Sequence, residues 1–162
     1  MGFNFNADEI LEVAERIESL GARFYALAAR TIPDAGMRRT LEGLADMEEG
    51  HMVVFARMRE GLSESEQTPP TFDPDGETAE YLQAVATGAV FDTSVSPEQL
   101  TASLKTPADV YRKAIEMENQ SIEFYTRMKP LAPGRWGAGK MDAIIAEERG
   151  HVQTLTVLLG AA

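Results

Sequence analysis

The chain has 162 residues, 26 acidic and 15 basic side chains, a formal net charge of −11 and no cysteine. The length suits one domain, and a chain without cysteine has no disulfides, thiolate metal ligands or cysteine-bound iron–sulfur clusters. The negative charge argues against nucleic acid or a membrane surface as a partner, because both attract cationic surfaces.

The first ten residues contain neither a basic segment nor an apolar run, so we expect no signal peptide. No run of 18 apolar residues occurs, so we expect no membrane-spanning helix. The expected location is the cytoplasm.

Two amphipathic helices are predicted in the first part of the chain. Residues 7–30 carry apolar side chains at spacings of three and four, and Asn6 with Glu9 fits a capping box. Residues 34–61 show the same periodicity, and Gly61 is suited to end the helix. The short connection predicts an antiparallel hairpin.

Two further long helices are predicted near the end of the chain. Thr106 and Pro107 are typical of a helix start, and the periodicity then extends to about Lys129. The last helix is expected from about Gly134 or Gly139 to about residue 159.

The order of these elements predicts an all-α, single-domain fold over residues 1–162. Hairpins over about 7–61 and 107–159 are joined by a crossover over about 62–106, in which we expect short helices over about 77–87 and from about Pro97. Two hairpins joined by one long crossover form a ferritin-like four-helix bundle.

The two hairpins repeat each other at an offset of 100 residues. The matching pairs that could bind metal or lie beside it are Glu18 and Glu118, Tyr25 and Tyr125, Glu48 and Glu148, and His51 and His151. The last pair accounts for both histidines of the chain. Such a match in every candidate ligand indicates a shared site.

The predicted metal ligands lie within the apolar stripes of their helices: Glu18, Glu48, His51, Glu118, Glu148 and His151. Buried carboxylates are costly and repel one another, so a pair of cations is needed to balance them. We expect the two Glu-x-x-His pairs to form one edge of the site, with Glu18 and Glu118 binding or bridging from the other side. This ligand set is typical of di-iron proteins, and manganese or zinc would also suit it.

A simpler interpretation applies to each residue taken alone. A single glutamate on an apolar stripe usually has its carboxylate in water, and a single buried histidine is usually only hydrogen-bonded. The remaining acids are expected to be solvated, among them Glu12, Glu15, Glu42, Glu49, Glu116, Glu123 and Glu147.

The combined motifs resemble those of rubrerythrins, whose ferritin-like domain carries Glu-x6-Tyr and then Glu-x-x-His, twice over. The resemblance spans about residues 7–159 and implies a centre of two iron ions that reduces hydrogen peroxide with electrons from a rubredoxin-type iron site. Because the chain has no cysteine, the electrons would come from another protein, such as a rubredoxin. Many rubrerythrins also have a ligating glutamate one turn after the first acid of the third helix, where this chain has Ser121.

Tyr25 and Tyr125 lie two turns beyond Glu18 and Glu118. Because helical side chains lean toward the N-terminus, each hydroxyl is expected to reach back and hydrogen-bond a ligand carboxylate. The alternative is that both rings serve only as core aromatics.

The sequence therefore predicts a non-haem di-iron redox protein that reduces peroxide or dioxygen. Two alternatives stay open: a ferroxidase or iron-storage protein, and a non-catalytic metal-binding or scaffold protein. A homodimer is also predicted, from an apolar strip of Met47, Val54 and Met58 on the second helix.

Overall fold

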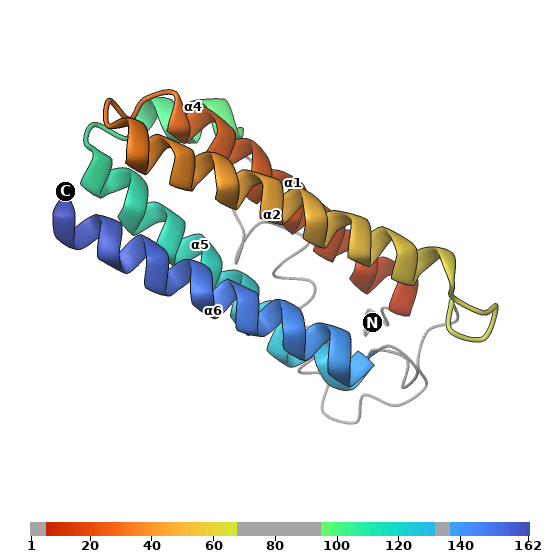
Figure 1. Ribbon diagram of the computed structural model, residues 1–162. Helices are drawn as coiled ribbons and strands as arrows, with labels where there is room; N and C mark the ends of the chain where they lie inside the picture. Colours follow the sequence, from red (N-terminus) through yellow and green to blue (C-terminus); the bar gives the residue numbers. More distant parts are fainter. Residues whose placement is uncertain (1–5, 68–94, 132–136) are drawn as a thin grey trace.

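In the computed structural model, residues 6–67, 95–131 and 137–162 are described, and helices are the only regular elements in these ranges (Figure 1). The elements are α1 (Ala7–Ala29), α2 (Ala35–Glu60), α4 (Pro97–Ser103), α5 (Pro107–Met128), a 3₁₀ turn (Lys129–Leu131) and α6 (Gly137–Ala161). The predicted all-α, ferritin-like bundle is confirmed. The short helix expected over about 77–87 lies outside the described residues, while the one expected from Pro97 is α4.

Two hairpins make up the bundle, one from α1 and α2 and the other from α5 and α6 (Figure 1). Helices α2 and α5 run in the same direction, so the chain must return along the bundle between them (Figure 1). This return explains why the connection between the hairpins is long.

Capping side chains fix where the helices begin. The Asn6 side chain accepts from the Glu9 backbone N–H, and the Glu9 carboxylate accepts from that of Asn6. Thr106 and Asp109 form the same reciprocal pair at the start of α5. Each cap satisfies backbone donors that have no partner within the helix.

The core consists of two apolar clusters, one on each side of a buried polar layer. The first cluster includes Ile10, Leu11, Ile17, Phe55, Met58, Phe124, Tyr125, Met128, Ile144 and Ile145. The second includes Phe24, Tyr25, Ile32, Leu41, Leu44, Val110, Tyr111 and Leu155. All four long helices contribute to both clusters, so apolar packing holds the polar layer from above and below.

The apolar strip predicted on α2 is mostly part of the core and not an exposed surface, so it does not support the homodimer, which stays a prediction. Met58 is 1% exposed and lies in the first cluster, and Val54 packs against the same cluster. Met47 alone of the three is exposed. The buried face of α2 is wider than one stripe because this helix packs against α1 as well as facing the other hairpin (Figure 1). In the described part of the chain, no helix is long and apolar enough to cross a membrane.

Candidate metal centre

The polar layer between the two clusters gathers the six predicted ligands, with at least one from each long helix. They are Glu18 on α1, Glu48 and His51 on α2, Glu118 on α5, and Glu148 and His151 on α6. Each is at most 4% exposed. Acidic side chains are rarely buried to this extent without a partner, so the layer requires compensating charge.

Helix periodicity explains why these side chains meet. Glu48 and His51 are three residues apart, so both project from the same face of α2. Glu148 and His151 repeat this arrangement on α6. The antiparallel hairpins then bring the two pairs to the same level of the bundle.

The layer contains two groups whose ligand atoms all lie within 4.8 Å of one another. One group is Glu18, Glu48, His51 and Glu148, and the other is Glu48, Glu118, Glu148 and His151. Glu48 and Glu148 belong to both groups, whereas Glu18 and Glu118 belong to one each. Glu48 and Glu148 are therefore the carboxylates that the two groups share, whereas Glu18 and Glu118, which the sequence analysis expected to bind or bridge, each belong to a single group.

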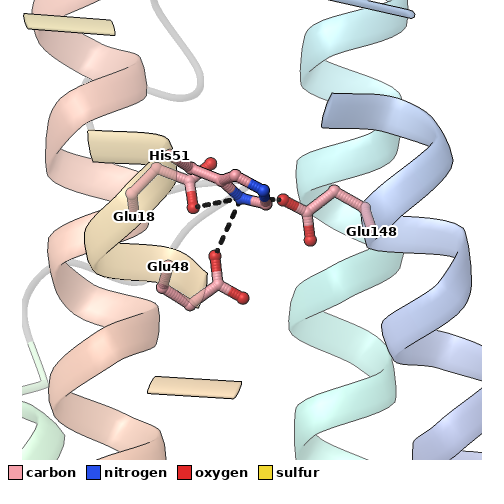
Figure 2. A group of neighbouring side chains, drawn as sticks. All are labelled: Glu18, Glu48, His51 and Glu148. Carbon is pink, nitrogen blue, oxygen red and sulfur yellow. Dashed lines mark ion pairs between the residues drawn. The ribbon is translucent and has the colours of Figure 1, made fainter. Parts of the chain in front are cut away.

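His51 turns its Nδ1 atom toward the carboxylates of the first group (Figure 2). This atom lies 3.0 Å from Glu148 Oε1, 3.4 Å from Glu18 Oε2 and 3.5 Å from Glu48 Oε2. A single nitrogen thus faces one carboxylate from each of three helices.

His151 repeats this geometry in the second group. Its Nδ1 atom lies 3.2 Å from Glu48 Oε1, 3.3 Å from Glu118 Oε1 and 3.2 Å from Glu148 Oε2. The imidazole rings of His51 and His151 are 5.9 Å apart and inclined by 20°. In both halves, Nδ1 is the nitrogen available to a metal.

Protonation compensates the charge of the layer when no cation is bound. Burial raises the pKa of Glu18 and Glu118, and the neighbouring carboxylates Glu48 and Glu148 raise it further. Burial opposes protonation of His151, but the carboxylates of Glu118, Glu148 and Glu48 around its ring outweigh burial and raise its pKa to about 12. Protons therefore take the places that cations would occupy.

The residues fit a pair of metal ions. Several buried polar atoms of the described structure have no hydrogen-bond partner, including Glu48 Oε1, His51 Nδ1, both Glu148 carboxylate oxygens and His151 Nδ1. Native proteins rarely leave such atoms unsatisfied, and a pair of cations, one in each group, would satisfy them. Four carboxylates with two imidazoles suit iron or manganese and would also accept zinc.

Sequence comparison decides the family. The Rubrerythrin family profile matches residues 9–159. The chain belongs to the rubrerythrin family.

Two individual proteins resemble this rubrerythrin-family chain. An uncharacterised protein of Archaeoglobus fulgidus is 42% identical over 50 residues, which are 31% of this chain and 78% of that protein. A solved structure from Thermotoga maritima, described as a ferritin-like diiron-carboxylate protein, matches with a TM-score of 0.76 and 20% identity. The match covers 98% of this chain and 97% of that one, and at this identity it shows the shared fold.

The two tyrosines of the rubrerythrin motif bind carboxylates of the opposite hairpin. The Tyr25 hydroxyl donates to Glu118 Oε1, and the Tyr125 hydroxyl donates to Glu18 Oε1. Both rings are almost fully buried. Each hydrogen bond holds in place the carboxylate that belongs to only one group. Glu18 accepts through Oε1 and turns Oε2 toward His51, whereas Glu118 Oε1 both accepts from Tyr25 and lies 3.3 Å from His151 Nδ1.

Glu147 lies on the exposed face that the sequence analysis assigned to it, but its carboxylate also contacts the site, which the sequence analysis did not predict. Its side chain is 51% exposed, yet its Oε2 atom lies 2.6 Å from His51 Nε2. The residue 100 positions earlier is Met47, which has no carboxylate, and His151 Nε2 is buried without a hydrogen-bond partner among the described residues. The two halves of the centre therefore differ outside their ligands, and this break in the repeat was the signal in the sequence.

Replacing Glu147 with Gln tests this contact. A carboxylate that accepts from a ligating histidine fixes the ring and raises its basicity, so its loss is expected to weaken metal binding in the His51 group about 10- to 100-fold. Competition of Zn²⁺ between the protein and a chelator measures this affinity. The matched control is Met47→Leu, which should leave both affinities unchanged, and equal affinities in E147Q and the parent chain would refute the role of Glu147.

Proposed function

We propose that the protein is a non-haem di-iron oxidoreductase that reduces peroxide, or dioxygen, with electrons from an external donor. The observation that carries this proposal is the buried set of four carboxylates and two Nδ1 atoms, divided into two overlapping groups. Membership of the rubrerythrin family supports the choice of iron. When bound there, a pair of Fe(II) ions would supply two electrons to an oxygen–oxygen bond.

The side chains of the chain perform three tasks in this function. Glu48 and Glu148 would hold both metals, because each belongs to both groups. Tyr25 and Tyr125 keep the two outer carboxylates in a fixed orientation. The apolar clusters on either side exclude bulk water, which limits side reactions at a reduced centre.

The electron donor would be another protein, since this chain has no cysteine with which to build a rubredoxin-type iron site. A rubredoxin is the donor that we propose.

Ferroxidase activity is a second candidate, and Ser121 is the observation that favours it. This serine stands where many rubrerythrins have an additional ligating glutamate, and its hydroxyl donates to the Met117 carbonyl at 3.2 Å. The hydroxyl is thus engaged within its own helix, and the site is limited to six ligands from the described residues. A ligand set of this kind also suits oxidation of Fe(II) by oxygen.

A single-turnover experiment separates these candidates. The reduced, iron-loaded protein is expected to consume about one equivalent of hydrogen peroxide, because each Fe(II) pair holds two electrons. Reduced rubredoxin with its reductase should convert this into continuous turnover. Retention of tens of iron ions per chain after incubation with excess Fe(II) and oxygen would instead establish iron storage, and no reaction with either oxidant would favour a scaffold role.

A further inference from the structure

We propose that the reducing centre accepts organic hydroperoxides as well as hydrogen peroxide, through an apolar cavity beside the carboxylates. The inference rests on the proposed peroxide reduction and names the substrate class for the same site. The cavity is lined mainly by residues of α1, α4 and α5. Carboxylates of Glu18, Glu48 and Glu118 border it.

The walls of the cavity are mainly apolar. Phe24 from α1, Leu100 from α4 and Met117 from α5 line it, together with other apolar side chains of these helices. An exposed ion pair between Arg23 and Glu98 links α4 to α1. An apolar wall holds water poorly and favours a hydrocarbon group.

The cavity is larger than hydrogen peroxide requires. Its volume is about 120 Å³. A water molecule takes up about 30 Å³ in the liquid, so the cavity has room for about four. Hydrogen peroxide has only two heavy atoms, and the remaining space would be filled by the alkyl or aryl group of a larger peroxide.

Two small residues keep this space open. Gly21 and Ser121 occupy equivalent positions in the repeat, one turn after Glu18 and Glu118, and both line the cavity. A Cβ atom at Gly21 would lie 3.4 Å from Glu48 Cγ, so even alanine would reach the carboxylate that borders the cavity. A long side chain at either position would occupy the substrate space.

The substrate that we propose is uncharged. The three carboxylates that border the cavity are candidate metal ligands, whose charge a bound pair of cations would balance, and Lys113 also lines the cavity. The reaction is ROOH + 2 e⁻ + 2 H⁺ → ROH + H₂O. The oxygen–oxygen bond breaks, the alcohol and water take up the protons, and the external donor restores the two electrons.

Binding is tested without turnover in the zinc-loaded protein, by titration with cumyl alcohol, the unreactive product of cumene hydroperoxide. Methionines carrying ¹³C-methyl groups are observed by NMR, and the Met117 signal is assigned by its loss in Met117→Leu. We expect cumyl alcohol to shift the Met117 signal and to leave that of Met128, which lies in the first core cluster, in place. An unmoved Met117 signal would overturn the cavity proposal.

Reactivity is tested by stopped-flow oxidation of the reduced, iron-loaded protein with hydrogen peroxide and with cumene hydroperoxide. Leu100→Trp should lower the rate with cumene hydroperoxide, relative to the rate with hydrogen peroxide, at least about tenfold. The matched control is Leu104→Trp, which alters a residue of the same segment that packs on the second core cluster.

The outcomes distinguish the two proposals. A rapid reaction with hydrogen peroxide alone, equal in all variants, would refute the organic substrate and leave peroxide reduction intact. A protein that reacts with neither peroxide would refute both proposals.

Discussion

Replacing Glu48 with Ala is expected to abolish binding of both metals, whereas His151→Ala should leave about one metal per chain. Glu48 belongs to both groups of ligand atoms, so its loss removes an oxygen from each. His151 belongs to one group only. Elemental analysis after anaerobic loading with Fe(II) measures the number of ions, with two expected for the parent chain.

The melting temperature gives a second measure of the same effect. An ion that binds only the folded state stabilises it by about 2.7 kcal/mol when its free concentration is 100 times the Kd. The parent chain should therefore gain stability on addition of metal, and the Glu48→Ala variant should not.

Glu49→Ala is the matched control, since it removes an exposed carboxylate from the adjacent position of the same helix. This variant should still bind two metals. If Glu48→Ala and His151→Ala retained equal numbers of ions, the overlap of the two groups at Glu48 would be irrelevant to binding, and no bridging role would hold.

The sequence was sufficient to predict the bundle and the six residues of the polar layer. Amphipathic periodicity set the faces of the long helices, and the repeat showed which polar side chains within those faces belong together. Apolar stripes at a spacing of three and four residues leave little choice of which side chains point inward. Glu148, which is fully buried, was found in this way.

Contacts between the hairpins could not be predicted from one helix at a time. Glu147 is half exposed, and periodicity assigns such a residue to solvent, but its carboxylate reaches His51 on α2. The sharing of Glu48 and Glu148 between the two groups depends on how far α2 and α6 approach each other. The cavity likewise depends on the placement of α4 against α1, which no periodic pattern encodes.

The metal-free protein is expected to lose stability as the pH rises from 5 to 8. Glu18 and Glu118 have raised pKa values in the folded chain because they are buried, whereas an unfolded glutamate has a pKa of about 4.3. Above pH 4.3, the folded chain therefore binds more protons than the unfolded chain. The free energy of unfolding then falls with pH, by about 1.4 kcal/mol per pH unit for each additional proton bound.

Different groups dominate in different parts of this range. Between pH 5 and 6 an unfolded histidine is mostly protonated, so the slope there reports the glutamates. Above pH 6.5 the raised pKa of His151, about 12, extends the same fall, because the folded chain keeps a proton that the unfolded chain loses. Glu48 and Glu148 have lowered pKa values; burial opposes this shift, but the adjacent side chains of Glu18 or Glu118 and of the two histidines outweigh it. Their contribution to the free energy of unfolding is lost only as the pH falls below about 4.3.

Urea denaturation at pH 5.0, 5.5 and 6.0 measures the slope due to the glutamates. The Glu18→Gln, Glu118→Gln double variant should flatten it, and the exposed pair Glu42→Gln, Glu49→Gln should not. A metal-free parent chain of constant stability over this range would show that the carboxylates are solvated.

Loading with zinc should reverse the sign of the pH dependence. The ions bind deprotonated carboxylates and imidazoles, so binding releases protons and becomes tighter as the pH rises. The loaded protein is therefore expected to gain stability between pH 5 and 8 while the metal-free protein loses it. The two opposite pH dependences distinguish a cation-binding site from a layer whose charge only protons balance. In a layer of the second kind, stability would fall equally with rising pH in the presence and absence of zinc.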